Sequence, residues 1–307
     1  MKTMLAEIKS MPERAQHFLR KSKEYTLPLG VPYIGMGSSY FAPLAFKYMG
    51  LDVRTELASE FYNYQYRGTK IPTGVLLSQS GRSTEVLWCA PLFDRYTAIS
   101  NNPDSSLCNF PNVGNTVPLL AGEEKYSSSK TYINTLLVLF RGFGFDVQAA
   151  VKLMVDKMPD YEQQGKALAE AVFEWIDHPK ITSLYITGNG PNIATAMQAA
   201  LIMSESTKLN FNGLPMAQYD HGPKETAKDS VVIQILSKGK TYERCKKLSE
   251  TIQRAGAHVL TVEEPDANEN ESVITNIIPF NFMAYYLSLK LNVQETFLVG
   301  GKVTEVK

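Results

Sequence analysis

A strand-like segment that breaks at two glycines and continues into a helix occurs twice in this chain. The first copy reads YIGMGSSYF, the second reads YITGNGPNI, and Gly188 follows Gly35 by 153 positions. Downstream of each copy comes another strand, turn and helix, in which SGRSTE from residue 80 matches KGKTYE from residue 238. A short strand follows in each half, YTAIS and then AHVLTV. Three matches in the same order indicate the duplication of one structural unit.

The alternation of strands with helices predicts the fold class. Such a chain forms an α/β protein with a mostly parallel sheet in each half and helices on both faces, a flavodoxin-like three-layer sandwich. We expect three regions: an N-terminal helical lead over residues 1–30, a first domain over 31–158 and a second domain over 165–307. The polar segment around DKMPDYEQQGKA is expected to link the two domains.

Charge and composition exclude several classes of function. The formal net charge is zero, from 31 basic and 31 acidic residues, so no overall field favours nucleic acid or an anionic membrane. No apolar run approaches the roughly 20 residues that span a bilayer, and the first residues read as an amphipathic helix rather than a signal peptide. The three separated cysteines fit neither a disulfide framework nor a zinc site. These observations predict a cytoplasmic protein without a metal or other cofactor.

Hydroxyl side chains gather where ligands of parallel sheets bind. Ser78, Ser80 and Ser83 follow an apolar strand, and the carboxyl ends of parallel strands are the usual ligand edge. Two more clusters of hydroxyl side chains also precede helices in the same half, Ser38–Ser39 and Ser127–Ser129. A solvated turn with an N-cap explains any one of them, whereas the three together favour a phosphate site. The run GMGSSY has Tyr40 in place of the third glycine of a dinucleotide fingerprint, which disfavours nicotinamide binding.

An ordered set of motifs resembles a known family. GMGSSYFA, ELASEFYNY, LSQSGRSTE, ISNNPDSSL and SSSKTY occur in this order, followed by AALIMSESTKLN, DHGP and GGKVTEV. The set resembles the tandem sugar-isomerase (SIS) family, above all the isomerase half of glutamine–fructose-6-phosphate amidotransferase, and it covers nearly the whole chain from Met4. Neither an N-terminal glutaminase domain nor a cysteine at position two is found. The chain is therefore similar to the stand-alone forms, which include phosphosugar isomerases and glucosamine-6-phosphate deaminases.

The resemblance implies a set of site residues. The phosphate of a sugar 6-phosphate would be held by Ser39, Ser78, Gln79, Ser80 and Ser83, with Ser128 nearby. Three residues align with the catalytic groups of the family. Glu205 corresponds to the base that moves a proton between adjacent carbons, and His221 to the histidine that opens the sugar ring. Lys302 corresponds to the lysine that forms an imine with the open-chain ketose. In the family this histidine comes from a neighbouring subunit, which implies a homodimer.

Departures from the family pattern leave the reaction open. Ile202 stands three positions before Glu205, where the amidotransferase carries a second lysine, so the polarity beside C1 of the sugar differs. The best-supported reaction is conversion of glucosamine 6-phosphate to fructose 6-phosphate and ammonia. A plain hexose-6-phosphate isomerase, a fructosamine-6-phosphate deglycase and a non-catalytic sugar-phosphate sensor are the alternatives.

Overall fold

The chain divides into two compact units, each built on its own sheet. The computed structural model describes residues 2–176 and 181–304. Among these residues, 10–148 and 297–304 form the first-sheet unit, and 2–9, 149–176 and 181–296 form the second-sheet unit. Each of the predicted domains encloses one sheet. The two ends of the chain are grouped differently from the prediction, because the N-terminal helix joins the second-sheet unit and the C-terminal segment joins the first.

The sheet of the first-sheet unit has five parallel strands in the order β2-β1-β3-β4-β5. The strands are β1 (Pro32–Gly35), β2 (Arg54–Leu57), β3 (Ile71–Leu77), β4 (Phe93–Ser100) and β5 (Val113–Pro118). β1 and the second half of β3 are fully buried. Continuous apolar runs of this kind are typical of parallel strands that are covered on both faces.

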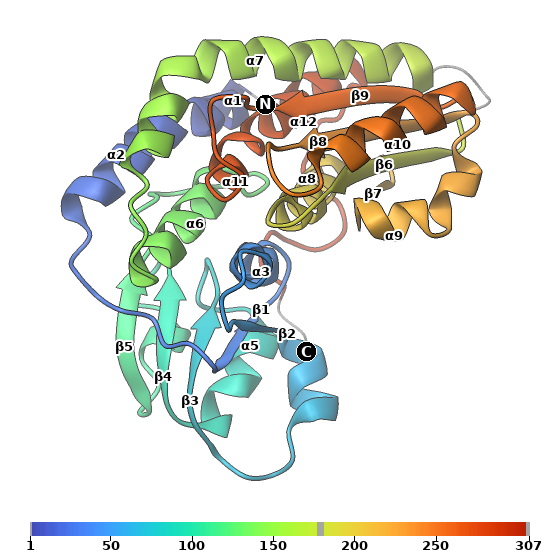
Figure 1. Cartoon of the computed structure of the whole chain (residues 1–307). Helices are drawn as coiled ribbons and strands as arrows, with labels where there is room; N and C mark the ends of the chain where they lie inside the picture. The colour runs from blue at the N-terminus through green and yellow to red at the C-terminus, as the bar shows by residue number, and fades with distance from the viewer. Residues whose placement is uncertain (1, 177–180, 305–307) are drawn as a thin grey trace. The chain divides into compact units, whose positions relative to one another are not determined.

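Helices cover this sheet, as Figure 1 shows for α3 and α6. The helical segments are α2 (Met11–Lys21), α3 (Ser38–Tyr48), α4 (Ala58–Glu60), η1 (Phe61–Gln65), α5 (Thr84–Cys89), η2 (Ala90–Leu92), η3 (Ser106–Cys108) and α6 (Lys130–Gly142). α6 packs against both α2 and α3, and nearly all of its residues are buried. A helix that is buried all round belongs to the interior of its unit.

The sheet of the second-sheet unit has four parallel strands in the order β7-β6-β8-β9. They are β6 (Ser183–Gly188), β7 (Phe211–Pro215), β8 (Ser230–Leu236) and β9 (His258–Glu263). All seven residues of β8 are buried, as expected for a central strand. Counted along the chain, the first four strands of both sheets have the same spatial order, which fits an internal repeat; the duplication itself stays a prediction.

One long helix accounts for a difference from the predicted organisation. The helices of the second-sheet unit are α1 (Lys2–Lys9), α7 (Gln148–Ile176), α8 (Asn192–Thr207), α9 (Met216–Asp220), η4 (Pro223–Thr226), α10 (Tyr242–Arg254), α11 (Ser272–Thr275) and α12 (Ile278–Lys290). The polar segment predicted as a linker lies inside α7, and Pro159 does not end this helix. Met154, Tyr161, Leu168 and Val172 are buried at helical spacing, so packing of one face outweighs the polar composition.

Candidate active site

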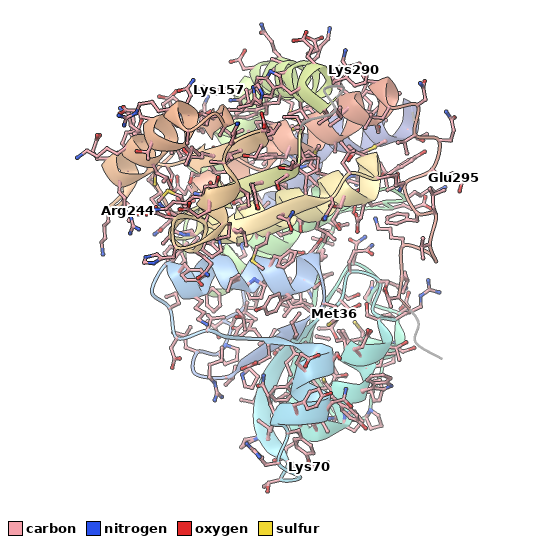
Figure 2. The ribbon with its side chains drawn as sticks, turned by 90° about the vertical axis from the view of Figure 1, so that its right-hand side faces the viewer. Met36, Lys70, Lys157, Arg244, Lys290 and Glu295 are labelled. Carbon is pink, nitrogen blue, oxygen red and sulfur yellow. The ribbon has the colours of Figure 1, made fainter. Side chains whose placement is uncertain are left out.

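The ligand edge of the first sheet is defined by its strand order. β1 and β3 are neighbours although β2 separates them in sequence, so the connections leave them in opposite directions. In sheets of this order, ligands bind at this switch point, beyond the carboxyl ends of the strands. Met36 follows β1 at that edge, and Lys70 precedes β3 at the other edge (Figure 2). Residues 78–83 form the loop after β3, and Ser39 lies in the first turn of α3, shortly after β1.

The loop after β3, residues 78–83, holds four of the six predicted phosphate ligands in one small turn, here called the serine loop. The hydroxyls of Ser78 and Ser83 lie 3.0 Å apart and form a hydrogen bond. The backbone N–H of Gly81 donates to Ser78 Oγ at 3.1 Å, and that of Arg82 donates to Ser80 Oγ at 3.2 Å. Ser78 is buried, whereas Ser80 and Ser83 are half-buried. The loop therefore presents preformed hydroxyl groups at the switch point.

Gly81 is required by the shape of this loop. Its φ of 65° lies in the left-handed region, and a Cβ at this position would overlap the side chain of Ser105. On the same side, Ser100 Oγ donates to the carbonyl of Gln79 at 3.3 Å, and the Asn101 N–H donates to it at 3.1 Å. Residues at the end of β4 thus hydrogen-bond to the serine loop and stabilise its conformation.

The two predicted phosphate ligands outside the serine loop, Ser39 and Ser128, lie in the same unit. Ser39 is in the first turn of α3, half-buried, with its N–H donating to the Met36 carbonyl at 3.1 Å. Gln79 belongs to the serine loop, and Ser128 lies two residues before α6, both half-buried. All six predicted phosphate residues therefore belong to the first-sheet unit.

Lys302 also belongs to the first-sheet unit, where it contacts Glu124, a residue that no sequence motif indicates. Its ammonium lies 3.0 Å from Glu124 Oε2, 3.0 Å from the Glu124 carbonyl and 2.6 Å from the Tyr126 carbonyl. Glu124 is buried, and 178 positions separate the two residues. No local pattern signals a pair at such a separation, so only the fold identifies it.

Glu124 also caps α6. Ser127 or Ser128 is the cap expected from the sequence, whereas the structure places Ser129 at the N-cap position, where it makes no side-chain cap hydrogen bond. Glu124 Oε1 instead accepts from the backbone N–H of Ser129 at 2.9 Å and of Thr131 at 3.2 Å. A carboxylate satisfies these N–H groups and interacts favourably with the positive end of the helix dipole, which explains the difference.

Lys130 is a second residue that the sequence analysis did not single out. It is the first residue of α6 and only 7% exposed. Within the described residues, its ammonium has no hydrogen-bond or ion-pair partner. Such a lysine has a largely buried side chain whose charge no carboxylate of the described residues compensates.

Glu205 lies in the last turn of α8, in the second-sheet unit, and is half-buried. Ile202, one turn earlier, is buried. The cation beside Glu205 is instead Lys208, whose ammonium donates to the Glu205 and Thr296 carbonyls. Burial lowers the pKa of Lys208, and the charges of Glu205 and Glu295 oppose that shift. A lysine thus accompanies Glu205, but on its C-terminal side.

His221 follows α9 in the second-sheet unit, and its side chain is exposed. Its backbone N–H donates to the Ala217 carbonyl at 3.1 Å, and no hydrogen bond or ion pair of its ring is found in the described part of the chain. The preceding Asp220 pairs with Lys224 at 3.0 Å and Arg244 at 3.1 Å. These ion pairs fix the end of α9, and the ring of His221 faces solvent.

The predicted residues therefore fall into two groups. The phosphate ligands and Lys302 belong to the first-sheet unit, and Glu205 and His221 belong to the second-sheet unit. Among residues 2–176 and 181–304, no cluster of three or more His, Cys, Asp or Glu side chains forms a metal site. In the same part of the chain, no helix is long and apolar enough to cross a membrane.

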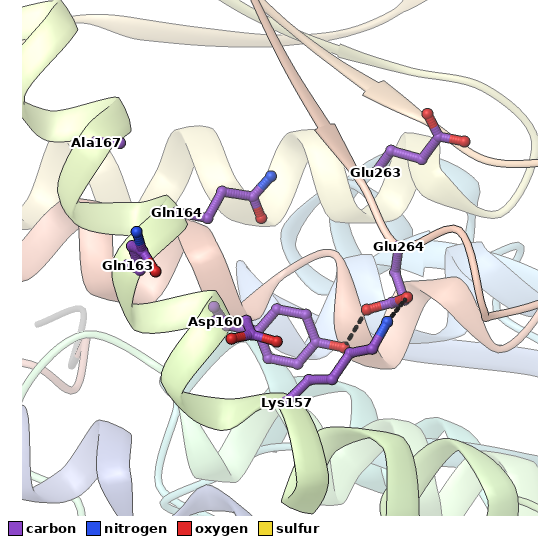
Figure 3. Close-up of a pocket in the computed structure, with 8 residues that line it drawn as sticks. Lys157, Asp160, Gln163, Gln164, Ala167, Glu263 and Glu264 are labelled. Carbon is purple, nitrogen blue, oxygen red and sulfur yellow. Dashed lines mark hydrogen bonds and ion pairs between the residues drawn. The ribbon is translucent and has the colours of Figure 1, made fainter.

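A pocket in the second-sheet unit lies apart from the predicted residues. It is lined by α7 residues and by the end of β9, as Figure 3 shows. Lys157 pairs with Glu264 at 2.8 Å and with Asp266 at 2.5 Å, and the Tyr161 hydroxyl donates to Glu264 at 2.6 Å. The polar groups at this pocket thus bind one another and tie α7 to β9.

Comparisons with known proteins relate the chain to sugar-phosphate enzymes. No protein-family model matches it. The isomerizing glutamine–fructose-6-phosphate aminotransferase 1 of Arabidopsis thaliana is 24% identical over 298 residues, covering 84% of this chain and 44% of that protein. The isomerizing enzyme of Xylella fastidiosa strain Temecula1 is 24% identical over 304 residues, covering 85% of this chain and 49% of that protein. The chain spans less than half the length of these relatives.

Solved structures share the fold. A glucosamine-6-phosphate deaminase from Thermotoga maritima has a TM-score of 0.76 at 18% identity, with 95% of this chain and 96% of that chain covered. The C-terminal domain of a glucosamine–fructose-6-phosphate aminotransferase from Francisella tularensis has a TM-score of 0.74 at 16% identity, covering 94% and 96%. A tagatose-6-phosphate ketose/aldose isomerase from Escherichia coli has a TM-score of 0.68 at 13% identity, covering 95% and 94%. The chain is thus homologous to part of the isomerizing aminotransferases, and it has the α/β sugar-isomerase fold predicted from its sequence.

Proposed function

We propose that this protein is a phosphosugar isomerase that converts glucosamine 6-phosphate to fructose 6-phosphate and releases ammonia. The observation that carries the proposal is the serine loop at the switch point between β1 and β3, where hydroxyl groups converge on the ligand edge of the sheet. Hydroxyl and backbone N–H donors bind a phosphate without a cluster of arginines. The likeness to a deaminase and to aminotransferases of the same fold supports the choice of substrate class.

The proposed chemistry begins with ring opening. His221 moves a proton between the ring oxygen and the C1 hydroxyl, which frees the C1 aldehyde, and imidazole exchanges protons readily near neutral pH. Glu205 then takes the proton from C2 and returns it to C1. A second proton passes from the amine nitrogen to the C1 oxygen, so the C1 carbonyl becomes a hydroxymethyl group and the C2 amine becomes an imine. Water adds to C2, the nitrogen leaves as ammonia, and the ketone of fructose 6-phosphate remains at C2.

Plain isomerisation of a hexose 6-phosphate is the second candidate. The same two residues would move a proton between C1 and C2 of a sugar that carries a hydroxyl at C2, without loss of nitrogen. Ile202 supports this alternative, because a buried apolar side chain stands one turn from Glu205. The likeness to a ketose/aldose isomerase supports it as well.

A panel of substrates tests both candidates. Purified protein is incubated separately with glucosamine 6-phosphate, glucose 6-phosphate and fructose 6-phosphate, and both ammonia and sugar products are measured. We expect ammonia only from the amino sugar, and no product from the Glu205→Gln variant. Interconversion of the neutral sugars without ammonia release would instead support plain isomerisation. Binding of sugar phosphates without any product would indicate a sensor.

A further inference from the structure

Lys302 is bound by three acceptor atoms, whereas a lysine that acts as a nucleophile needs a free amine. Its ammonium has three N–H groups, and three oxygen atoms lie within hydrogen-bond distance: Glu124 Oε2, the Glu124 carbonyl and the Tyr126 carbonyl. The side chain is only 19% exposed. An amine that donates three hydrogen bonds, one of them to a carboxylate, has all its N–H groups engaged and is held in one position.

The carboxylate that receives Lys302 is itself fixed. Glu124 Oε1 accepts from the N–H and the hydroxyl of Ser129, each at 2.9 Å, and from the N–H of Thr131 at 3.2 Å. Glu124 Oε2 accepts from the Thr131 hydroxyl and from Lys302. The side chain of Glu124 is fully buried. A buried carboxylate with this set of donors has little freedom to move, so it defines where the lysine sits.

Lys302 is also the principal anchor of the C-terminal segment, residues 297–304. Leu298 and Val299 are 63% and 99% exposed, and Gly300 and Gly301 add no side-chain contacts. The Thr304 carbonyl accepts from the Thr84 N–H at 3.4 Å, a long hydrogen bond at the start of α5. Among the described residues of this segment, Lys302 has the side chain with the most hydrogen bonds.

We propose that Glu124 is a positioning residue that holds Lys302 as a fixed positive charge and thereby seats the C-terminal segment on the loop before α6. The effect on turnover rests on the proposed function, whereas the effect on Lys302 does not. In this arrangement the lysine acts as a stationary cation at the site. Glu124 touches no reacting atom and acts only through Lys302.

The reactivity of the Lys302 amine tests the proposal without substrate. The full-length protein is treated with an acetylating reagent between pH 7 and 10, and the labelling rates of Lys302 and Lys125 are compared by mass spectrometry. Lys125 is an internal control because it lies in the same loop with 70% of its side chain exposed. We expect Lys302 to label at least about tenfold more slowly than Lys125 in the wild type. Equal rates would overturn the proposal.

Variants extend the test to the carboxylate. Glu124→Gln keeps the shape but removes the charge, and Glu123→Gln is the matched control, since Glu123 is 79% exposed and pairs only with Lys125 among the ion pairs of the described chain. We expect Lys302 labelling to rise about tenfold in Glu124→Gln and to stay unchanged in Glu123→Gln. Unchanged labelling in a folded Glu124→Gln protein would overturn the proposal. If this variant fails to fold, the wild-type comparison still decides.

Kinetics separate this proposal from the proposed function. In Glu124→Gln we expect kcat to fall about tenfold or more, with KM for the sugar phosphate within about twofold, because the serine loop is unchanged. Lys302→Met should lower kcat by a similar factor, and the double variant should add little. An additive double variant would contradict action through Lys302. A wild type without turnover would refute the proposed function and leave the labelling result intact.

Discussion

At the residue scale, the predicted phosphate site relies on neutral side chains. Ser78 and Ser83 share a hydrogen bond, and Ser80 accepts from the Arg82 N–H, so their oxygen atoms are oriented before any ligand arrives. A site that is already ordered loses less conformational entropy on binding. Each hydroxyl that donates to a phosphate should therefore contribute measurably to affinity.

Replacement of Ser80 by Ala tests this contribution. A hydrogen bond to a charged group contributes about 1.5–3 kcal/mol, so KM for the sugar phosphate should rise at least about tenfold. The matched control is Ser106→Ala, an exposed serine of η3 in the same unit, which should leave KM unchanged. An unaltered KM in Ser80→Ala, with thermal stability retained, would exclude Ser80 as a ligand.

Lys130 gives a prediction about stability in the absence of ligand. Lys130 is 7% exposed at the first position of α6, and its ammonium has no partner in the described chain. Lys130→Met keeps the apolar stem and removes the charge, so we expect the free energy of unfolding to rise by about 1–3 kcal/mol. Chemical denaturation measures this change, and Lys125→Met is the exposed control. A less stable Lys130→Met protein would contradict the assignment of an uncompensated charge.

The residue scale also marks a limit of prediction from the sequence. Ser78, Ser80 and Ser83 were identified because they follow an apolar strand directly, and the structure gathers them in one loop. Their role as phosphate ligands stays a prediction. Glu124 was not identified, because its partner lies 178 positions away and its capping role needs the exact path of the loop before α6. Contacts between distant positions leave no local pattern.

At the element scale, α7 shows how buried ion pairs connect a helix to a sheet. Lys157 and Tyr161 lie one turn apart on α7, and both bind Glu264 just after β9. Figure 3 shows Lys157 beside Glu264. Burial alone would raise the pKa of Glu264, but the hydrogen bonds from Lys157 and Tyr161 outweigh it and hold the pKa below its ordinary value. The ionised carboxylate therefore stabilises the folded state.

This carboxylate predicts a stability loss in acid. A lowered pKa in the folded state means that the stabilisation is present above the ordinary carboxylate pKa and is lost as the pH falls through the folded value. Glu264→Gln should lower the free energy of unfolding at pH 7 by about 1–3 kcal/mol and flatten its dependence on acid pH. Urea denaturation at several pH values measures both effects. Asp160→Asn, at an exposed position of the same pocket, is the control. An unchanged acid dependence in Glu264→Gln would contradict this role.

The elements themselves were largely predictable. Strands such as β3 and β8 are apolar runs that end at small or hydroxyl residues, and both sheets are parallel as predicted. The polar segment expected to link the two domains lies instead within α7, in the second-sheet unit. Burial of Met154, Tyr161 and Leu168 against the rest of the unit keeps this segment helical, and such packing is a property of the whole unit.

At the scale of the whole molecule, the predicted catalytic groups belong to different units. Glu205 and His221 lie in the second-sheet unit, and Lys302 lies in the first-sheet unit although it is the last of the three in sequence. The exposed ring of His221 supports our proposal that it completes the site of a second copy of the chain. A homodimer would then contain two composite sites.

Hybrid dimers test this arrangement. A Glu205→Gln chain and a His221→Ala chain should each be inactive alone. After subunit exchange, about half of the dimers are expected to be hybrids, each with one site that carries both native residues, so part of the activity should return. Native mass spectrometry confirms the exchange. If the exchanged mixture stays inactive, each site is built within one chain and the shared site is refuted.

The most direct test of the proposed reaction follows the nitrogen-bearing carbon itself. Glucosamine 6-phosphate labelled with carbon-13 at C2 is incubated with the purified protein, and the C2 signal is recorded by NMR while ammonia is measured in the same sample. The proposal predicts that the amine-bearing C2 signal is replaced by that of the ketose C2 of fructose 6-phosphate, with one ammonia formed for each labelled carbon converted. The deamination would be contradicted if the signal of the amine-bearing C2 persisted. This result counts in a sample where the wild-type protein is folded and interconverts neutral hexose 6-phosphates.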